Sequence, residues 1–202
     1  MIVIPAGKFI ADKTISQDEV TIPKGFAVSR YAVTFDEWDA AVAAGGVKHN
    51  PKDEGWGRGR RPVINISFDD ARAYVAWLSA TTASHYRLLF QSEWEYVCRG
   101  GTTGAFGDVI REDQANFISD RTKKVGSYAA NVFGVYDMHG NVDEWCNDGW
   151  DFRTIEPATV PARGFRGGSW RDESKTHWSV FTIGPNGRYN HVGLRVARTT
   201  CG

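Results

Sequence analysis

The chain has 202 residues, which is enough for one domain with a substantial hydrophobic core. It carries 24 Lys and Arg against 24 Asp and Glu, so its formal net charge is zero and nothing in the charge balance favours a nucleic acid as a partner. Its apolar runs reach about six residues, whereas a membrane-spanning helix needs roughly 20, and residues 1–7 lack the basic start of a signal peptide. We therefore expect a single domain over residues 1–202 and no membrane span.

The residue usage indicates a loop-rich fold. The chain holds 22 Gly and 8 Trp but only 2 Met, so it turns often and fills space with rigid aromatic rings. Its three cysteines, Cys98, Cys146 and Cys201, are too few for a disulfide framework and form no Cys-x-x-Cys metal pair. We therefore interpret them as structural thiols.

Two helices are predicted from their start signals. Thr34 is followed three residues later by Glu37, which is the pattern of a reciprocal capping box, and Gly45 then ends the helix. Ser67 and Asp70 repeat the pattern, and apolar residues at helical spacing follow as far as about residue 79. Both helices lie in the first half of the chain.

A third short helix and then mostly irregular structure are predicted for the rest of the chain. The helix begins near Ser92 and ends at Arg99, where a cation followed by glycine suits a helix C-terminus. Beyond Gly101 frequent glycines interrupt the chain and leave short apolar pieces, of which residues 132–136 and 192–196 are predicted to be strands.

Five ordered blocks of the sequence share one resemblance. They are residues 62–77, 87–101, 131–145, 166–170 and 193–195, of which the third, around Gly-Asn-Val and Glu-Trp, is the most specific. Together they resemble the formylglycine-generating sulfatase-modifying proteins over residues 4–198. The resemblance implies an α+β, C-type lectin-like fold, with short helices around small twisted antiparallel sheets and much irregular loop.

The catalytic members of this family hold copper with a pair of cysteines located between the Gly-Gly-Ser block and the last block. Here residues 171–192, between those blocks, contain no cysteine. The resemblance therefore implies a protein that is not an enzyme and requires no cofactor. The alternative is a related oxidoreductase with an atypical site, in which a single thiol is activated by a neighbouring base.

We call residues 171–191 the C-terminal segment. It has neither a strand nor a helix period, and it mixes large apolar side chains with polar ones, as recognition surfaces do. We expect it to bind a protein or a cell-surface ligand. The alternative is that alternate residues face the core as strand positions. The candidate ligand-binding residues are Asp172, Ser174, Thr176, His177, Trp178, Val180, Phe181, Thr182, Ile183, Tyr189, Asn190 and His191.

The position of this segment resembles one branch of the family, the variable proteins of diversity-generating retroelements. In them a stretch between the Gly-Gly-Ser-Trp block and a Gly-Phe-Arg-like block is rewritten by mutagenesis at adenines. Asparagine codons altered in this way yield most of the candidate residues, but not Trp178 or Lys175. A constant interaction domain is the other possibility. Location in the cytoplasm or on a virus particle is left open.

Four residues match positions where family members hold calcium. They are Asn141 and Glu144 in the third block, and Asn116 with Asp120 before it. Calcium takes six to eight oxygens, which glycine-rich loops supply as carbonyls and carboxylates. The resemblance thus implies an optional structural calcium. The alternative is that Asn141 and Glu144 cap turns by accepting hydrogen bonds from backbone N–H groups.

Overall fold

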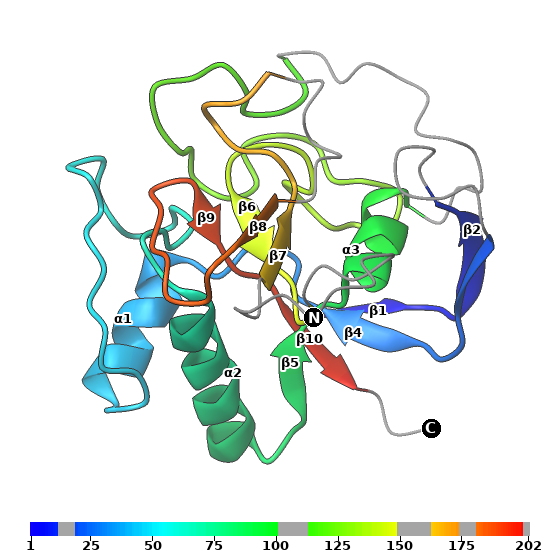
Figure 1. The fold of residues 1–202 in the computed structure, drawn as a ribbon, viewed down its shortest axis with the longest axis horizontal. Helices are drawn as coiled ribbons and strands as arrows, with labels where there is room; N and C mark the ends of the chain where they lie inside the picture. Colours follow the sequence, from blue (N-terminus) through cyan, green and yellow to red (C-terminus); the bar gives the residue numbers. More distant parts are fainter. Residues whose placement is uncertain (12–18, 101–112, 149–162, 174–180, 200–202) are drawn as a thin grey trace.

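The computed structural model describes residues 1–11, 19–100, 113–148, 163–173 and 181–199, with residues 181–183 described for their backbone alone. The described chain is an α+β structure of small sheets, three helices and long loops (Figure 1). None of the described helices is long and apolar enough to cross a membrane.

One antiparallel sheet joins the start and the end of the described chain. Its strand order is β1-β4-β10-β5, and the strands are β1 (Ile2–Ile4), β4 (Phe26–Val28), β10 (Val196–Thr199) and β5 (Tyr86–Leu88). Ala27 of β4 lies opposite Val3 on one side and Arg198 on the other. A separate hairpin pairs β2 (Gly7–Ile10) with β3 (Glu19–Ile22). The last strand of the chain is therefore central to this sheet.

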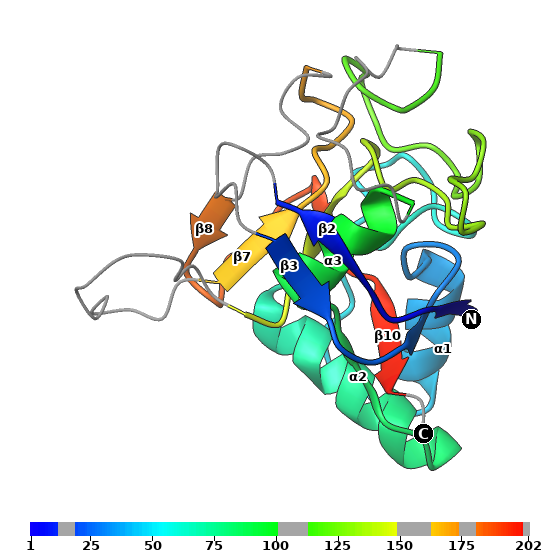
Figure 2. The ribbon, with the colours of Figure 1, turned by 90° about the vertical axis from the view of Figure 1, so that its right-hand side faces the viewer.

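A second four-stranded sheet carries the C-terminal segment. Its order is β8-β7-β6-β9, with β6 and β9 parallel and the other pairs antiparallel. The strands are β6 (Asp143–Trp145), β7 (Arg163–Arg166), β8 (Phe181–Ile183) and β9 (Val192–Gly193). Figure 2 shows β7 and β8 side by side, with β8 at the edge of the sheet.

The first two predicted helices are confirmed at their starts. Helix α1 (Phe35–Ala43) follows Thr34, and helix α2 (Phe68–Thr82) follows Ser67, each with a complete capping box. In α2 the Ser67 hydroxyl accepts a hydrogen bond from Asp70 N–H, while the Asp70 carboxylate accepts one from Ser67 N–H. The helix continues three residues beyond the predicted end at residue 79, to Thr82, before Ala83 adopts a left-handed conformation.

The third helix, α3 (Gln91–Cys98), is confirmed, with its start one residue before Ser92. It begins after Phe90, whose backbone N–H donates to the Glu93 carboxylate at 3.0 Å. Arg87 forms an ion pair with the same carboxylate and so fixes it between β5 and α3. The helix ends before Arg99, as predicted.

Aromatic side chains fill two hydrophobic clusters. One lies around Trp38, which is fully buried and stacks on Tyr74 with ring centroids 5.3 Å apart. The other lies around Trp94 of α3 and extends to the first sheet. Trp145 completes the first cluster and donates its indole N–H to the Ile66 carbonyl. The framework is thus fixed by rings that also satisfy backbone acceptors.

The strand prediction for residues 132–136 is wrong. This stretch is a turn, because the Asn131 side-chain oxygen accepts hydrogen bonds from Phe133 N–H and Val135 N–H. The side chain therefore replaces the ladder partner that a strand needs. The second predicted piece, residues 192–196, is divided between β9 and β10, so the two ends of that piece belong to different sheets.

Candidate functional site

The Gly-Gly-Ser-Trp block forms the entrance to the C-terminal segment. It follows β7, and both Gly167 and Gly168 have positive φ angles. Gly168 N–H donates to the buried Asp143 carboxylate at 2.9 Å, and Ser169 donates through its N–H and its hydroxyl to the Asp172 carboxylate. Asp172 is thus a capping residue of this turn, and its contact with a ligand stays a prediction.

Backbone carbonyls of the segment accept hydrogen bonds from the framework. The Pro185 carbonyl accepts from Phe68 N–H at 3.0 Å, and the Tyr189 carbonyl accepts from Asn65 N–H at 2.9 Å. The Trp170 indole donates to the Asn190 carbonyl at 3.1 Å. These bonds use no side chain of residues 185–190. They hold the chain in place whichever side chains it carries.

Side chains between Gly184 and Asn190 are exposed or half-buried. Tyr189 is 36% exposed, and Arg188 makes an ion pair with Asp70 at the start of α2. Two framework tryptophans lie next to this stretch: Trp170 and Trp56 are both half-buried, with ring centroids 5.1 Å apart. Sequence reasoning missed Trp56, because the glycine-rich loop around it has no period that assigns it to a face.

The expected surface position is wrong for His191. Its side chain is only 4% exposed and lies against the rings of Phe165 and Tyr189. Burial and the positive charge of Arg171 lower the pKa of His191 to about 4, so the imidazole is neutral near pH 7. The His191 carbonyl accepts a hydrogen bond from Asp143 N–H, and the next residue, Val192, pairs with Asp143 in the sheet. This pairing holds His191 against the buried side of the second sheet.

The remaining candidates divide into three groups. Asn190 is half-buried beside Tyr189. Phe181, Thr182 and Ile183 form β8, which pairs with β7, so at these three residues the segment is a strand, as the alternative interpretation expected. The candidates that lie outside the described residues are Ser174, Thr176, His177, Trp178 and Val180.

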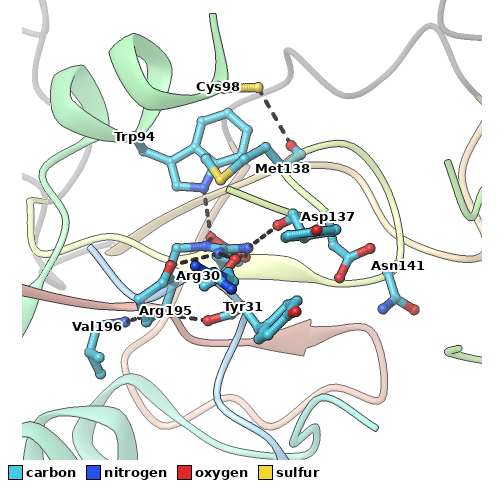
Figure 3. Close-up of polar contacts among 12 residues, drawn as sticks. Arg30, Tyr31, Trp94, Cys98, Asp137, Met138, Asn141, Arg195 and Val196 are labelled. Carbon is cyan, nitrogen blue, oxygen red and sulfur yellow. Dashed lines mark hydrogen bonds and ion pairs between the residues drawn. The ribbon is translucent and has the colours of Figure 1, made fainter. Parts of the chain in front are cut away.

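A buried ion pair joins Glu144, in the middle of β6, to Arg195, which lies between β9 and β10; Figure 3 shows Arg195 and the nearby Trp94. Arg195 contacts both oxygens of the Glu144 carboxylate at 2.8 to 3.0 Å, and the Trp94 indole donates to the same carboxylate at 2.8 Å. Arg195 also donates to the Ser29, Arg30 and Tyr136 carbonyls. The guanidinium therefore ties the second sheet to the loop after β4.

These contacts bear on the calcium prediction. A cation at Glu144 would face the positive charge of Arg195, so this carboxylate does not fit a calcium site. Asp120 is exposed and pairs with Arg121. Among the described residues, no group of three or more His, Cys, Asp or Glu side chains could hold a metal ion.

The two asparagines of the predicted calcium site tie loops together. The Asn141 side chain accepts from Lys123 N–H at 2.8 Å and donates to the Lys123 carbonyl, as the alternative for Asn141 foresaw. Asn116 donates to Asn141, and its own buried side-chain oxygen has no hydrogen-bond partner among the described residues. One such oxygen is far from a full coordination sphere. Calcium binding stays a prediction, which melting with and without a chelator tests.

The thiols of Cys98 and Cys146 are buried and form no disulfide. Burial raises the pKa of both thiols well above the usual value, with the carboxylates of Glu95 and Asp148 as the next contributions. A nucleophilic cysteine needs the opposite shift. Cys98 lies 3.5 Å from a ring nitrogen of His139, but its environment favours the neutral thiol. Cys201 lies outside the described residues.

Comparison with known families identifies the chain. Residues 1–200 match the family described as "Sulfatase-modifying factor enzyme 1-like domain". The chain belongs to this family. A curated relative, the serine/threonine-protein kinase pkn1 of Chlamydia caviae, is 38% identical over 129 residues, which are 57% of this chain and 20% of that protein. The match thus spans a fifth of the length of the relative.

Solved structures of similar shape confirm the fold of this sulfatase-modifying-factor-like chain. PvdO from Pseudomonas aeruginosa has a TM-score of 0.83 and 32% identity, over 98% of this chain and 93% of PvdO. Treponema denticola variable protein 1 has a TM-score of 0.80 and 23% identity, over 99% and 95% of the two chains. The predicted α+β, C-type lectin-like fold is therefore confirmed.

Proposed function

We propose that this protein is a noncatalytic binding module that presents the C-terminal segment to a protein or cell-surface ligand, with side chains diversified by a retroelement. The observation that carries the proposal is the way residues 185–190 are held. Framework donors bond to their backbone carbonyls, and the side chains are left exposed or half-buried. A loop anchored in this way tolerates substitution because the anchors do not depend on side-chain identity.

The flanks of the segment support the same interpretation. Arg166 and Ser169 before it, and Val192 and Leu194 after it, are at most 2% exposed. A buried frame therefore flanks a stretch in which the described side chains of residues 184–190 are exposed or half-buried. The likeness in shape to a protein described as a variable protein agrees with this arrangement.

The oxidoreductase alternative lacks a supporting observation. The interval in which the catalytic relatives place their cysteine pair has no cysteine, and the two described thiols have raised pKa values. Copper binding together with oxidation of a cysteine-containing peptide would restore this alternative. We interpret the fold as a scaffold for binding, since a fold by itself does not imply a reaction.

The DNA that flanks the coding sequence tests the proposal. We expect a reverse-transcriptase gene and a near-copy of the codons for residues 171–191, with the differences located at adenines of the copy. Because Asp172 caps the entrance turn and His191 is buried, their codons should match the copy. Without a near-copy, or with differences spread over residues 163–169 and 192–197, diversification is refuted and a constant interaction domain is left.

A further inference from the structure

A second concave site lies away from the C-terminal segment. It is a cavity of about 470 Å³ between α1, α2, β5 and β10. Figure 1 shows α1 and α2 next to each other, with β5 and β10 beside α2. Trp77 and Leu78 line the cavity, whereas Asp70, which contacts Arg188 of the C-terminal segment, lies two turns earlier in α2. Seven residues of helix correspond to about 10 Å.

Aromatic rings form the wall of this cavity. Tyr74 and Trp77 come from α2, with ring centroids 5.7 Å apart, and Tyr86 comes from β5. The Tyr74 ring stacks on Trp38, and the backbone at Tyr86 is held by a hydrogen bond from its N–H to the Ser79 hydroxyl at 2.9 Å. The Trp77 ring packs on Gly46 so closely that a Cβ there would lie 2.2 Å from it.

Two phenol hydroxyls in the wall have no hydrogen-bond partner in the described part of the chain. Tyr74 is 4% exposed, yet neither its hydroxyl nor that of Tyr86 has a hydrogen-bond partner among the described residues. Neither hydroxyl oxygen is fully buried without a partner, and both tyrosines line the cavity. Burial, followed by the charge of Glu37, raises the pKa of Tyr74, which keeps the phenol protonated. A bound molecule would meet rings and unpaired hydroxyls together.

The edge of the cavity carries one carboxylate that is held in place. Glu37 Oε2 accepts hydrogen bonds from the Thr34 N–H at 2.8 Å and from the Thr34 hydroxyl at 2.9 Å, which fixes the carboxylate through the capping box of α1. Arg30 is the cationic side chain of the lining and is exposed, and the Met1 amino group is a second positive charge among the lining residues. A positive ligand inside would lie near the carboxylate, whereas Arg30 can turn toward solvent.

We propose that this cavity binds an organic ammonium ion, with its charge against Glu37 and the faces of Trp77 and Tyr86 and its apolar part on Val33 and Val196. Ring faces attract cations through their quadrupole, and tryptophan does so most strongly. The site is independent of the proposed display of the C-terminal segment. Failure of either proposal therefore leaves the other unchanged.

Calorimetric titration of the whole protein with benzyltrimethylammonium tests the proposal. Neopentylbenzene has the same shape without the charge, and benzenesulfonate carries the opposite charge. We expect saturable binding of the ammonium ion and at least about tenfold weaker binding of both other compounds. Equal binding of the neutral compound, tighter binding of the anion, or no binding of the ammonium ion at millimolar concentration would each overturn it.

Variants locate the binding. Glu37→Gln preserves the capping box and should weaken ammonium binding, whereas Arg30→Gln should strengthen it. Trp77→Phe keeps a smaller ring and should weaken binding less than Trp77→Leu. Trp56→Leu removes a half-buried tryptophan near the C-terminal segment and should leave the affinity unchanged. If Glu37→Gln and Trp77→Leu both bind the ammonium ion with the affinity of the wild-type protein, and circular dichroism shows that both are folded, the site is refuted.

Discussion

Arg195 holds together more parts of the structure than the sequence around it indicates. It lies in a short apolar piece, yet its guanidinium is fully buried, pairs with Glu144 and donates to three carbonyls from two loops. A buried ion pair is not by itself strongly stabilising, because both charges lose their hydration. Loss of one partner is costly, since the other charge is then buried without compensation.

We predict that Arg195→Met lowers the free energy of unfolding by about 3–5 kcal/mol. Glu144 would be left as an uncompensated charge, and three backbone carbonyls would lose a donor. Adding Glu144→Gln to this variant should recover part of the loss, because it removes the buried charge. Denaturant unfolding of the single and double variants measures both effects, and a double variant no more stable than Arg195→Met would contradict the explanation.

His191 makes stability depend on pH. Its pKa in the folded protein is about 4, against an ordinary value of 6.5. Below pH 6.5 the histidine becomes protonated in the unfolded chain but stays neutral in the folded protein. The contribution of His191 to the free energy of unfolding is therefore complete above pH 6.5 and is lost as the pH falls toward 4. Burial raises the pKa of Asp143 well above its usual value, and this acts in the opposite direction.

Comparison with His191→Phe separates the histidine from Asp143, which titrates in both proteins. Relative to this variant, the wild-type protein should lose about 3 kcal/mol between pH 6.5 and pH 4. Denaturant unfolding at several pH values measures the difference. A difference that does not change with pH would mean that His191 becomes protonated in the folded protein as readily as in the unfolded chain.

At the scale of elements, the start of α2 links the framework to the C-terminal segment. Ser67 and Asp70 close the capping box, Phe68 N–H donates to the Pro185 carbonyl, and the Asp70 carboxylate also pairs with Arg188. The Arg188 side chain is 46% exposed, so solvent weakens this ion pair. The cap itself satisfies backbone groups of the helix and does not depend on the pair.

Ser67→Ala should therefore cost about 1 kcal/mol of unfolding free energy, whereas Arg188→Ala should cost less than about 0.5 kcal/mol. The serine is 2% exposed and its hydroxyl serves Asp70 on both sides of the box. Chemical denaturation of the two variants gives the comparison. Equal losses would indicate that the segment, and not the cap, stabilises this end of α2.

Across the whole molecule, the two sheets are joined by the chain that follows the C-terminal segment. Val192 and Gly193 pair with β6, and a few residues later Val196 enters the centre of the first sheet. Leu194 lies between them and is fully buried. The exposed stretch before residue 191 is thus separated from the core by the short buried flank of residues 192–194, so side-chain changes in that stretch do not alter the core.

Replacement of Arg188 and Tyr189 by alanine should shift the melting temperature by no more than about 2–4 °C, because their backbone anchors are kept. Leu194→Ala, a few residues later, should cost about 2–5 kcal/mol and lower the melting temperature by several degrees more. Thermal unfolding of both variants gives the test. A large loss in the first variant would assign the stretch to the core.

By itself the sequence determined the starts of α1 and α2, because a capping box is complete within four residues. It also determined the family, through five ordered blocks, and with the family the α+β, C-type lectin-like fold. Only the tertiary structure decided that His191 is buried, that Phe181–Ile183 form an edge strand, and that Glu144 is paired with Arg195, 51 residues away. The physical reason is that burial and strand pairing depend on distant partners, which no local pattern records.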